Sequence, residues 1–282
     1  MKAARFELFR PRDLSEALDH LAGATGLVKV LAGGQSLGPM LNLRLVEPDA
    51  LVDIAGIPEL RRIDREADAL VVGACVTHAD FEDGRAPDVG TDMMARVAAG
   101  IAYRAVRNRG TIGGSLAHAD PAADWVSTLS ALGAEIEIAS RAGRRRLAIG
   151  AFLTGALSTA LQPGELLVSV RIPLVSGAAR FGYVKHARKI GEFAHAIGAA
   201  LVDPERGIAR AVAGAIDAPP LVFEDAADLY DRSTGLDREE TGRRLAAAGV
   251  EDMVDRHIHV EALARALAQA FDAPAPTLRS AA

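Results

Sequence analysis

The chain has 282 residues, enough for one large domain or two modest ones. Half of the residues are hydrophobic, 24% are charged and the formal net charge is −5, so we expect no nucleic-acid-binding surface. The single cysteine, Cys75, excludes an internal disulfide and any zinc or iron–sulfur site held by cysteines of this chain.

The sequence also predicts no membrane segment. No apolar run reaches about 18 residues, so we expect no membrane span. The N-terminal segment carries charges throughout and lacks the apolar core of a secretory signal. A cytoplasmic protein is therefore expected.

The first hundred residues predict alternating helices and strands. Asp13 and Glu16 form a capping-box pattern before a helix with leucines at helical spacing, which Gly23 ends. Apolar runs then predict strands over 27–31, 51–54 and 70–73, and apolar spacing predicts a helix over 91–103.

The middle of the chain predicts one clear helix and several strands. Asp120 as N-cap and Pro121 as first helical residue predict a helix whose apolar face includes Trp125. Strict alternation predicts a half-buried strand over 134–138, followed by a return strand through 147–149. A further strand is predicted over 166–172.

The last part of the chain begins at a weak boundary signal over 175–179. A strand is predicted near 181–184, with further β segments to about Ile216. Helical segments are predicted near 223–231, 237–249 and 257–271, and the residues from 273 onward are expected to be frayed.

Two glycine-rich segments carry the strongest functional signal. Ala32-Gly33-Gly34-Gln35-Ser36 follows a predicted strand. Gly110-Thr111-Ile112-Gly113-Gly114-Ser115 likewise places a pair of glycines beside polar side chains. Adjacent glycines let backbone N–H groups approach an anion, so two such segments could hold the two phosphates of a dinucleotide. Neither segment has the spacing of a Rossmann or P-loop motif. The alternative is that both are tight turns at strand ends.

The sequence around these segments resembles the FAD-binding medium subunit of the molybdenum hydroxylases, in carbon monoxide dehydrogenase-like and xanthine dehydrogenase-like enzymes. The residues that carry the resemblance are VLAGGQSLGPMLNLRL (30–45), RNRGTIGGSLAHADPAADW (107–125), LLVSVRIP (166–173) and YVKHARKIGEFA (183–194).

The resemblance implies an α+β architecture: a vanillyl-alcohol-oxidase-type (PCMH-type) FAD-binding fold of two α/β subdomains plus a small C-terminal α+β domain. Residues 1–177 would form the FAD-binding domain, with subdomains at about 1–56 and 57–177. Residues 178–282 would form the C-terminal domain of the carbon monoxide dehydrogenase flavoprotein type.

The resemblance also implies a set of FAD contacts at matching positions. They are Val30, Leu31, Ala32, Gly33, Gly34, Gln35, Ser36, Leu37, Ile101, Thr111, Ile112, Gly113, Gly114, Ser115, Asp124, Leu167, Lys185 and Phe193. Some family members have histidine in place of Gln35, and many have asparagine in place of Ser115. Glu192 stands where aspartate is usual, and Phe193 lacks the hydroxyl of the tyrosine that some relatives use.

Simpler interpretations of these residues stay open. Asp124 could cap a helix, Lys185 could be a solvated charge and Phe193 could belong to the core. Arg104, Arg107 and Arg109 could favour phosphate binding or be ordinary surface charges. The basic cluster over 141–146 could be a solvated turn or a docking patch for a partner. Scattered single histidines predict no metal site.

The function implied by the resemblance is that of an oxidoreductase subunit. FAD would take electrons from two [2Fe–2S] clusters of a small subunit and pass them to an external acceptor. A large subunit with molybdenum in a molybdopterin cytosine dinucleotide would hydroxylate the substrate, and the three subunits would pair into a dimer of heterotrimers. No catalytic residue is then expected on this chain. The alternatives are a stand-alone flavin oxidoreductase and a non-catalytic nucleotide-binding or assembly module.

Overall fold

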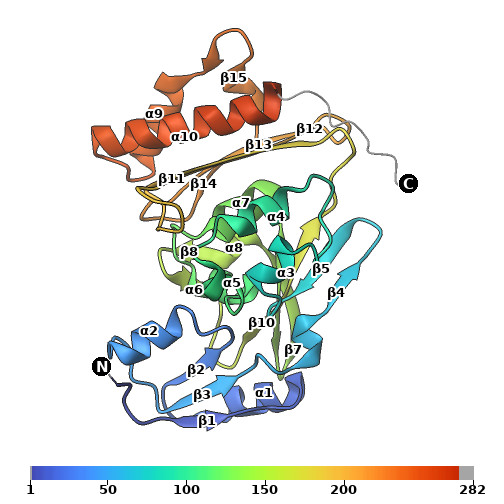
Figure 1. The fold of residues 1–282 in the computed structure, drawn as a ribbon, viewed down its shortest axis with the longest axis vertical. Coiled ribbons are helices and arrows are strands. Elements are labelled where there is room, and N and C mark those ends of the chain that lie inside the picture. Colours follow the sequence, from blue (N-terminus) through green and yellow to red (C-terminus); the bar gives the residue numbers. More distant parts are fainter. Residues whose placement is uncertain (1, 273–282) are drawn as a thin grey trace.

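The computed structural model describes residues 2–272, and its elements form three layers along the long axis of the molecule (Figure 1). A small N-terminal sheet lies at one end, a five-stranded sheet with its helices lies in the middle, and a four-stranded sheet covered by a long helix lies at the other end. Within residues 2–272, no helix is long and apolar enough to cross a bilayer, and no group of His, Cys, Asp or Glu is arranged to hold a metal ion.

The N-terminal layer consists of β1 (Glu7–Phe9), α1 (Leu14–Ala22), β2 (Val28–Leu31), α2 (Leu37–Asn42) and β3 (Ala50–Asp53). Its sheet is parallel, in the order β1-β3-β2. Helix α1 begins as predicted, because the Asp13 carboxylate accepts a hydrogen bond from the N–H of Glu16. The Glu16 carboxylate accepts from the N–H of Arg12, so the predicted box does not close on Asp13 itself.

The middle layer is built on an antiparallel sheet. Its elements are η1 (Pro58–Arg61), β4 (Ile63–Arg65), β5 (Ala69–Gly73), α3 (His78–Glu82), α4 (Met93–Ala99), α5 (Arg104–Arg107), α6 (Ile112–His118), α7 (Asp124–Leu132), β6 (Glu135–Ser140), β7 (Gly143–Ala148), α8 (Ile149–Phe152), β8 (Leu153–Gly155), β9 (Ser158–Thr159) and β10 (Leu166–Pro173). The sheet order is β4-β5-β10-β6-β7. In β6 the buried Ile136 and Ile138 alternate with half-buried glutamates, which confirms the predicted alternation.

The C-terminal layer has an antiparallel sheet in the order β11-β12-β13-β14. Its elements are β11 (Arg180–His186), β12 (Ala196–Asp203), β13 (Ile208–Gly214), β14 (Leu221–Phe223), η2 (Ala226–Asp228), β15 (Tyr230–Asp231), β16 (Gly235–Leu236), α9 (Arg238–Ala247) and α10 (Met253–Asp272). Strand β12 is buried along its whole length. Ala199 and Leu201 join the core of the middle layer, whereas Ala200 and Val202 join the core beneath α10. The sheet is therefore covered on both faces.

Several predicted boundaries are wrong. Helix α7 begins at Asp124, and Asp120 and Pro121 lie in a turn before it. The Asp120 carboxylate accepts from the N–H of Ala122, and the Pro121 carbonyl accepts from the N–H of Ala215 in the C-terminal layer. Tertiary contacts thus hold this segment as a turn despite its helix-start signal.

Other differences concern length and type. The helix expected over 91–103 is only α4, and the helix expected from 257 begins at Met253. Residues 223–231 form no α-helix: they contain the end of β14, the short η2 turn and β15. The predicted helix over 237–249 is confirmed as α9, with Asp237 as its N-cap. The predicted frayed residues from 273 onward lie outside the described residues.

The segment between β10 and β11 is fixed by a buried carboxylate. Asp203, at the end of β12, is fully buried and accepts hydrogen bonds from the backbone N–H and the hydroxyl of Ser176 at 2.8 and 2.6 Å. The chain passes here from the middle layer to the C-terminal layer. The division of the chain into domains at residue 177 stays a prediction.

One buried hydrogen bond joins α3 to α7. Trp125 is fully buried and donates its Nε1–H to Nδ1 of His78 over 2.9 Å. An indole nitrogen only donates, so the neutral imidazole carries its proton on Nε2. Burial, followed by the nearby charge of Arg107, lowers the pKa of His78 to about 4.

We expect acid to destabilise the folded chain through His78. Between its ordinary pKa of 6.5 and the folded value of about 4, the unfolded chain binds a proton that the folded chain does not. The free energy of unfolding should therefore fall as the pH falls through this window, by up to about 1.4 kcal/mol per pH unit. Urea unfolding across the window measures this slope. His78→Gln, whose amide oxygen can accept from Trp125, should lose it, and equal slopes would contradict the assignment.

Candidate functional site

A cavity of about 710 Å³ is lined by residues of all three layers. Its wall comes from the chain after β2, from parts of the segment between Ile101 and Asp124, from the start of β10, and from Lys185 with residues 191–193. Ligand pockets commonly span roughly 300–1,000 Å³. The cavity is therefore large enough for a cofactor rather than a single small anion.

The first glycine segment presents backbone donors to this cavity. After β2 the chain turns through Gly34, whose φ is +70°, and enters α2 at Ser36. In the described part of the chain, no acceptor is recorded for the backbone N–H groups of residues 33–37, and these residues line the cavity. Successive N–H groups around a left-handed residue form a concave nest that binds anions. This segment can hold a phosphate.

The second glycine segment is a helix start, not an open loop. Thr111 is the N-cap of α6, and its hydroxyl accepts from the N–H of Gly114 at 3.0 Å. The N–H of Ile112 is donated to Val76, and the N–H of Gly113 is donated to Ala74. These backbone donors are already used inside the protein. The segment offers the cavity side-chain groups, chiefly the hydroxyl of Ser115, instead of a second nest.

The glycines of the two segments are required by packing. A Cβ on Gly33 would lie 1.9 Å from the carbonyl oxygen of Arg109, and a Cβ on Gly113 would lie 2.5 Å from the Cβ of Ala74. Such distances are far shorter than any contact between atoms that are not bonded. The first segment therefore rests directly on the backbone of the second, and the second rests on the middle sheet.

Asp124 links two layers at the cavity. It is 5% exposed in the first turn of α7, where Ala123 is the N-cap and Asp124 makes no capping bond. Its carboxylate accepts from the hydroxyl of Tyr183 at 2.7 Å and from Nζ of Lys185 at 3.0 and 3.1 Å, both on β11. The capping role for Asp124 and the solvated position for Lys185 are both wrong. Burial, followed by the charge of Asp124, raises the pKa of Tyr183 well above its usual value.

The predicted contact residues meet at this one cavity. All of them line it except Leu31 and Ile112. Ile112 is fully buried in the core of the middle layer, and Leu31 packs beneath Gly34. Phe193 lines the cavity and is 72% exposed, so its interpretation as a core residue is wrong.

The sequence reasoning missed several lining residues. The polar ones are Lys29, His78, His118, Asp120 and Glu165, and Tyr103 adds an exposed aromatic ring. The capping box of Thr77 and Asp80 marks the start of a helix at His78, but it does not indicate a place at the cavity. Only the tertiary fold brings these residues to the cavity.

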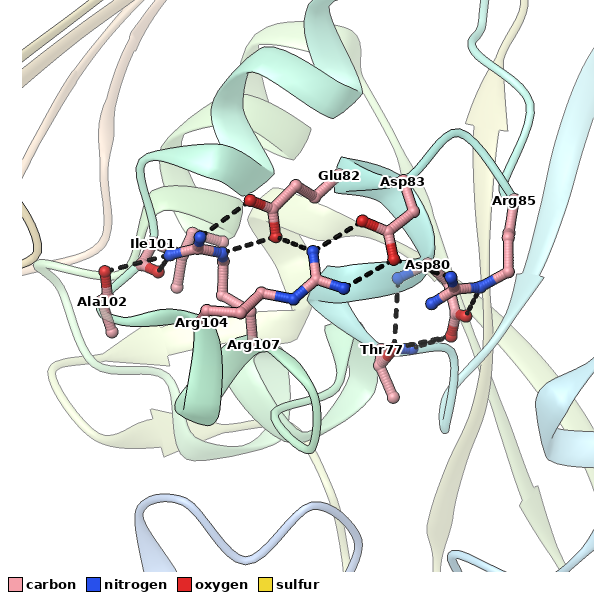
Figure 2. A network of polar contacts seen from close by, with 9 residues as sticks. All are labelled: Thr77, Asp80, Glu82, Asp83, Arg85, Ile101, Ala102, Arg104 and Arg107. Carbon is pink, nitrogen blue, oxygen red and sulfur yellow. Dashed lines mark hydrogen bonds and ion pairs between the residues drawn. The ribbon is translucent and has the colours of Figure 1, made fainter.

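The arginines before the second segment are mostly paired. Arg104 and Arg107 bind Glu82 and Asp83 of the region around α3 (Figure 2). The backbone of Arg109 supports Gly33. The charges of Arg104 and Arg107 are thus balanced within the chain.

The basic hairpin over 141–146 is also paired. Arg141 contacts Asp19, Arg145 contacts Glu165, and Arg146 contacts Glu135. Arg144 contacts two glutamates. Internal pairing favours the solvated turn over a free docking patch.

Comparisons with known proteins agree with this architecture. The family described as "FAD binding domain in molybdopterin dehydrogenase" matches residues 4–175. Caffeine dehydrogenase subunit beta of Pseudomonas sp. is 37% identical over 206 residues, covering 73% of this chain and 70% of that protein. The carbon monoxide dehydrogenase medium chain of Afipia carboxidovorans is 33% identical over 253 residues, covering 86% and 85%.

Solved structures extend the similarity to nearly the whole chain. Carbon monoxide dehydrogenase from Hydrogenophaga pseudoflava matches with a TM-score of 0.84 and 31% identity, covering 96% of this chain and 99% of that one. Quinoline 2-oxidoreductase from Pseudomonas putida 86 matches with a TM-score of 0.82 and 33% identity, covering 96% and 98%. The family match, the curated relatives and the shared PCMH-type fold show that the chain belongs to the FAD-binding medium subunits of the molybdenum hydroxylases.

Proposed function

We propose that this chain binds FAD in the cavity between its layers and serves as the electron-transfer subunit of a molybdenum-containing dehydrogenase. Electrons would come from iron–sulfur clusters of a partner subunit and leave to an external acceptor. The observation that carries the proposal is the run of backbone N–H groups over 33–37, which line a cavity of cofactor size and have no acceptor within residues 2–272. Membership of an FAD-binding family supports it.

The residues present fit FAD. The N–H groups of residues 33–37 would bind the diphosphate, with the side chains of Gln35, Ser36 and Ser115 as further polar groups. Asp124 and Lys185 would contact the cofactor through atoms already held in their mutual ion pair. Ile101, Leu167 and Phe193 would provide apolar contact. FAD, when bound, would supply the ability to accept electrons singly and release them in pairs.

Partner subunits would hold the other redox groups. We expect a small subunit with two [2Fe–2S] clusters and a large subunit with molybdenum in molybdopterin cytosine dinucleotide, assembled as a dimer of heterotrimers. Relatives named as medium chains support such a complex. This chain cannot hold the clusters itself, since its one cysteine, Cys75, is buried and its pKa is raised by burial to about 12.

The organisation of the chain follows from the same proposal. Residues 1–177 would form the FAD-binding domain and residues 178–282 the C-terminal domain, whose Lys185 and Phe193 reach the cavity. No residue of this chain would act as catalyst, because substrate hydroxylation would take place on the large subunit. A cytoplasmic location stays a prediction.

The first test is purification of the full-length chain with the subunits that accompany it. We expect flavin and iron–sulfur absorbance, FAD as the released flavin, and two co-purifying subunits, one of them with molybdenum. Flavin that is bleached by a substrate without partners would instead support a stand-alone flavin oxidoreductase. A protein that binds nucleotide but no flavin, even after FAD is added, would support a nucleotide-binding or assembly module.

Gly33→Ala tests the first glycine segment. The added Cβ would lie 1.9 Å from the Arg109 carbonyl, so the segment must move and its N–H groups must leave the nest. We expect at least about a tenfold rise in the dissociation constant of FAD, or about 1.4 kcal/mol. Gly38→Ala in α2 is the matched control, because its Cβ would meet nothing within 4 Å. Full occupancy by FAD in Gly33→Ala would contradict the role of the segment.

The Asp124–Lys185 pair should stabilise the contact between α7 and β11 even without cofactor. Lys185→Met leaves a buried carboxylate without its cation and should lower the free energy of unfolding by about 1–3 kcal/mol. Asp124→Asn added to Lys185→Met should recover part of the loss, since no unpaired charge then remains. Urea unfolding of the flavin-free proteins measures both. Simple additivity of the two single changes would show that the pair is not coupled.

A further inference from the structure

We propose that Arg107 is a positioning residue that holds the turn at residues 101–103 and thereby shapes the cavity wall that faces the flavin. The inference rests on the proposed FAD site and assigns a role to a side chain that the proposal leaves unused. Arg107 does not line the cavity itself. Its effect on the cofactor would pass through the backbone that it binds.

Arg107 binds the backbone of the wall directly. Its side chain is only 11% exposed, and its Nη1 donates to the carbonyl oxygens of Ile101 at 2.9 Å and Ala102 at 3.1 Å (Figure 2). Ala102 has a φ of +41°, a conformation that costs a residue with a Cβ about 1–3 kcal/mol. Two charge-assisted hydrogen bonds to this turn offset that cost.

Glu82 fixes the guanidinium in the orientation that this contact needs. Nε and Nη2 of Arg107 donate to Glu82 at 2.8 and 2.7 Å, one to each carboxylate oxygen (Figure 2). A bidentate pair of this kind defines the plane of the guanidinium and leaves Nη1 aimed at the turn. The hydrogen bond from Arg107 also lowers the pKa of Glu82, so the anchor stays ionised.

The turn held by Arg107 supports two parts of the wall. Ile101, Ala102 and Tyr103 line the cavity. A Cβ on Gly191 would lie 2.8 Å from the carbonyl oxygen of Ala102, so residues 191–193 of the C-terminal layer rest on the same turn. A shift of the turn would therefore move its own side chains and also the segment that carries Phe193.

Arg104 provides a matched comparison. It belongs to the same helix and shares Glu82, but it pairs chiefly with Asp83 and is 47% exposed (Figure 2). It makes no recorded hydrogen bond to the cavity wall. A lysine in place of either arginine keeps the charge but cannot form the planar fork. Only at Arg107 should the loss of these hydrogen bonds change the cavity wall.

The test compares Arg107→Lys with Arg104→Lys in the full-length chain and its co-purifying subunits. Hydrogen exchange of peptides over 100–108, measured without added FAD, should become several-fold faster in Arg107→Lys alone. The FAD dissociation constant should rise at least about tenfold in Arg107→Lys and less than about twofold in Arg104→Lys. The visible circular dichroism of bound flavin should change in the same variant. Glu82→Gln, which loosens the anchor, should shift each measurement in the same direction by a smaller amount.

The outcomes separate this inference from the proposed function. Unchanged exchange in Arg107→Lys, or FAD affinity and dichroism equal to those of Arg104→Lys, would overturn the role of Arg107. A wild-type protein without flavin would overturn the proposed function, and the exchange comparison would still decide whether Arg107 holds the turn. If Arg107→Lys does not fold, the comparison of Glu82→Gln with Arg104→Lys decides the same question.

Discussion

The direct contact between two stretches of backbone, at Gly33 and at Arg109, is the constraint on which the site depends. It brings the end of the N-terminal parallel sheet against the segment that starts α6, with no side chain between them. Gly113 makes a similar close contact with Ala74, the residue after β5 of the middle sheet. The two glycine segments are therefore parts of one stacked assembly. The donors of residues 33–37 reach the cavity because the glycine beside them allows the layers to approach so closely.

The fold could be predicted from the sequence wherever local signals decide the structure. Asp13 begins a helix as predicted, and the alternation in β6 gives its buried face correctly. Asp120 and Pro121 carry an equally good local signal and form a turn, because the Pro121 carbonyl accepts from Ala215, some ninety residues further along the chain. In residues 223–231, the end of β14 pairs with β13, and β15 pairs with the nearby β16. Local patterns do not contain the contact between Pro121 and Ala215.

The site shows the same division. The glycine segments indicated the right place, but composition alone could not show how their backbone donors are used. Within residues 2–272, the N–H groups of residues 33–37 have no acceptor, whereas those of the second segment bond to Val76, Ala74 and Thr111. Asp124 looked like a helix cap, because its partners Tyr183 and Lys185 lie on β11 of another layer. His78 reaches the cavity by way of its bond to Trp125, a pairing over 47 positions that no local spacing encodes. The sequence therefore predicted where the glycine segments lie, but not which distant residues the site residues bind.

Two of these pairings balance cations at or near the cavity proposed to hold a redox cofactor. Arg107 is balanced by Glu82, and Lys185 is balanced by Asp124. His78 is held neutral near pH 7 by burial and by the charge of Arg107. Oriented backbone N–H groups add a favourable field for phosphate, and their partial charges do not change with pH. The surroundings of a flavin bound there would depend on the positions of the backbone and side chains that line the cavity. Small shifts of the turn at residues 101–103 would accordingly matter more to it than the loss of a surface charge.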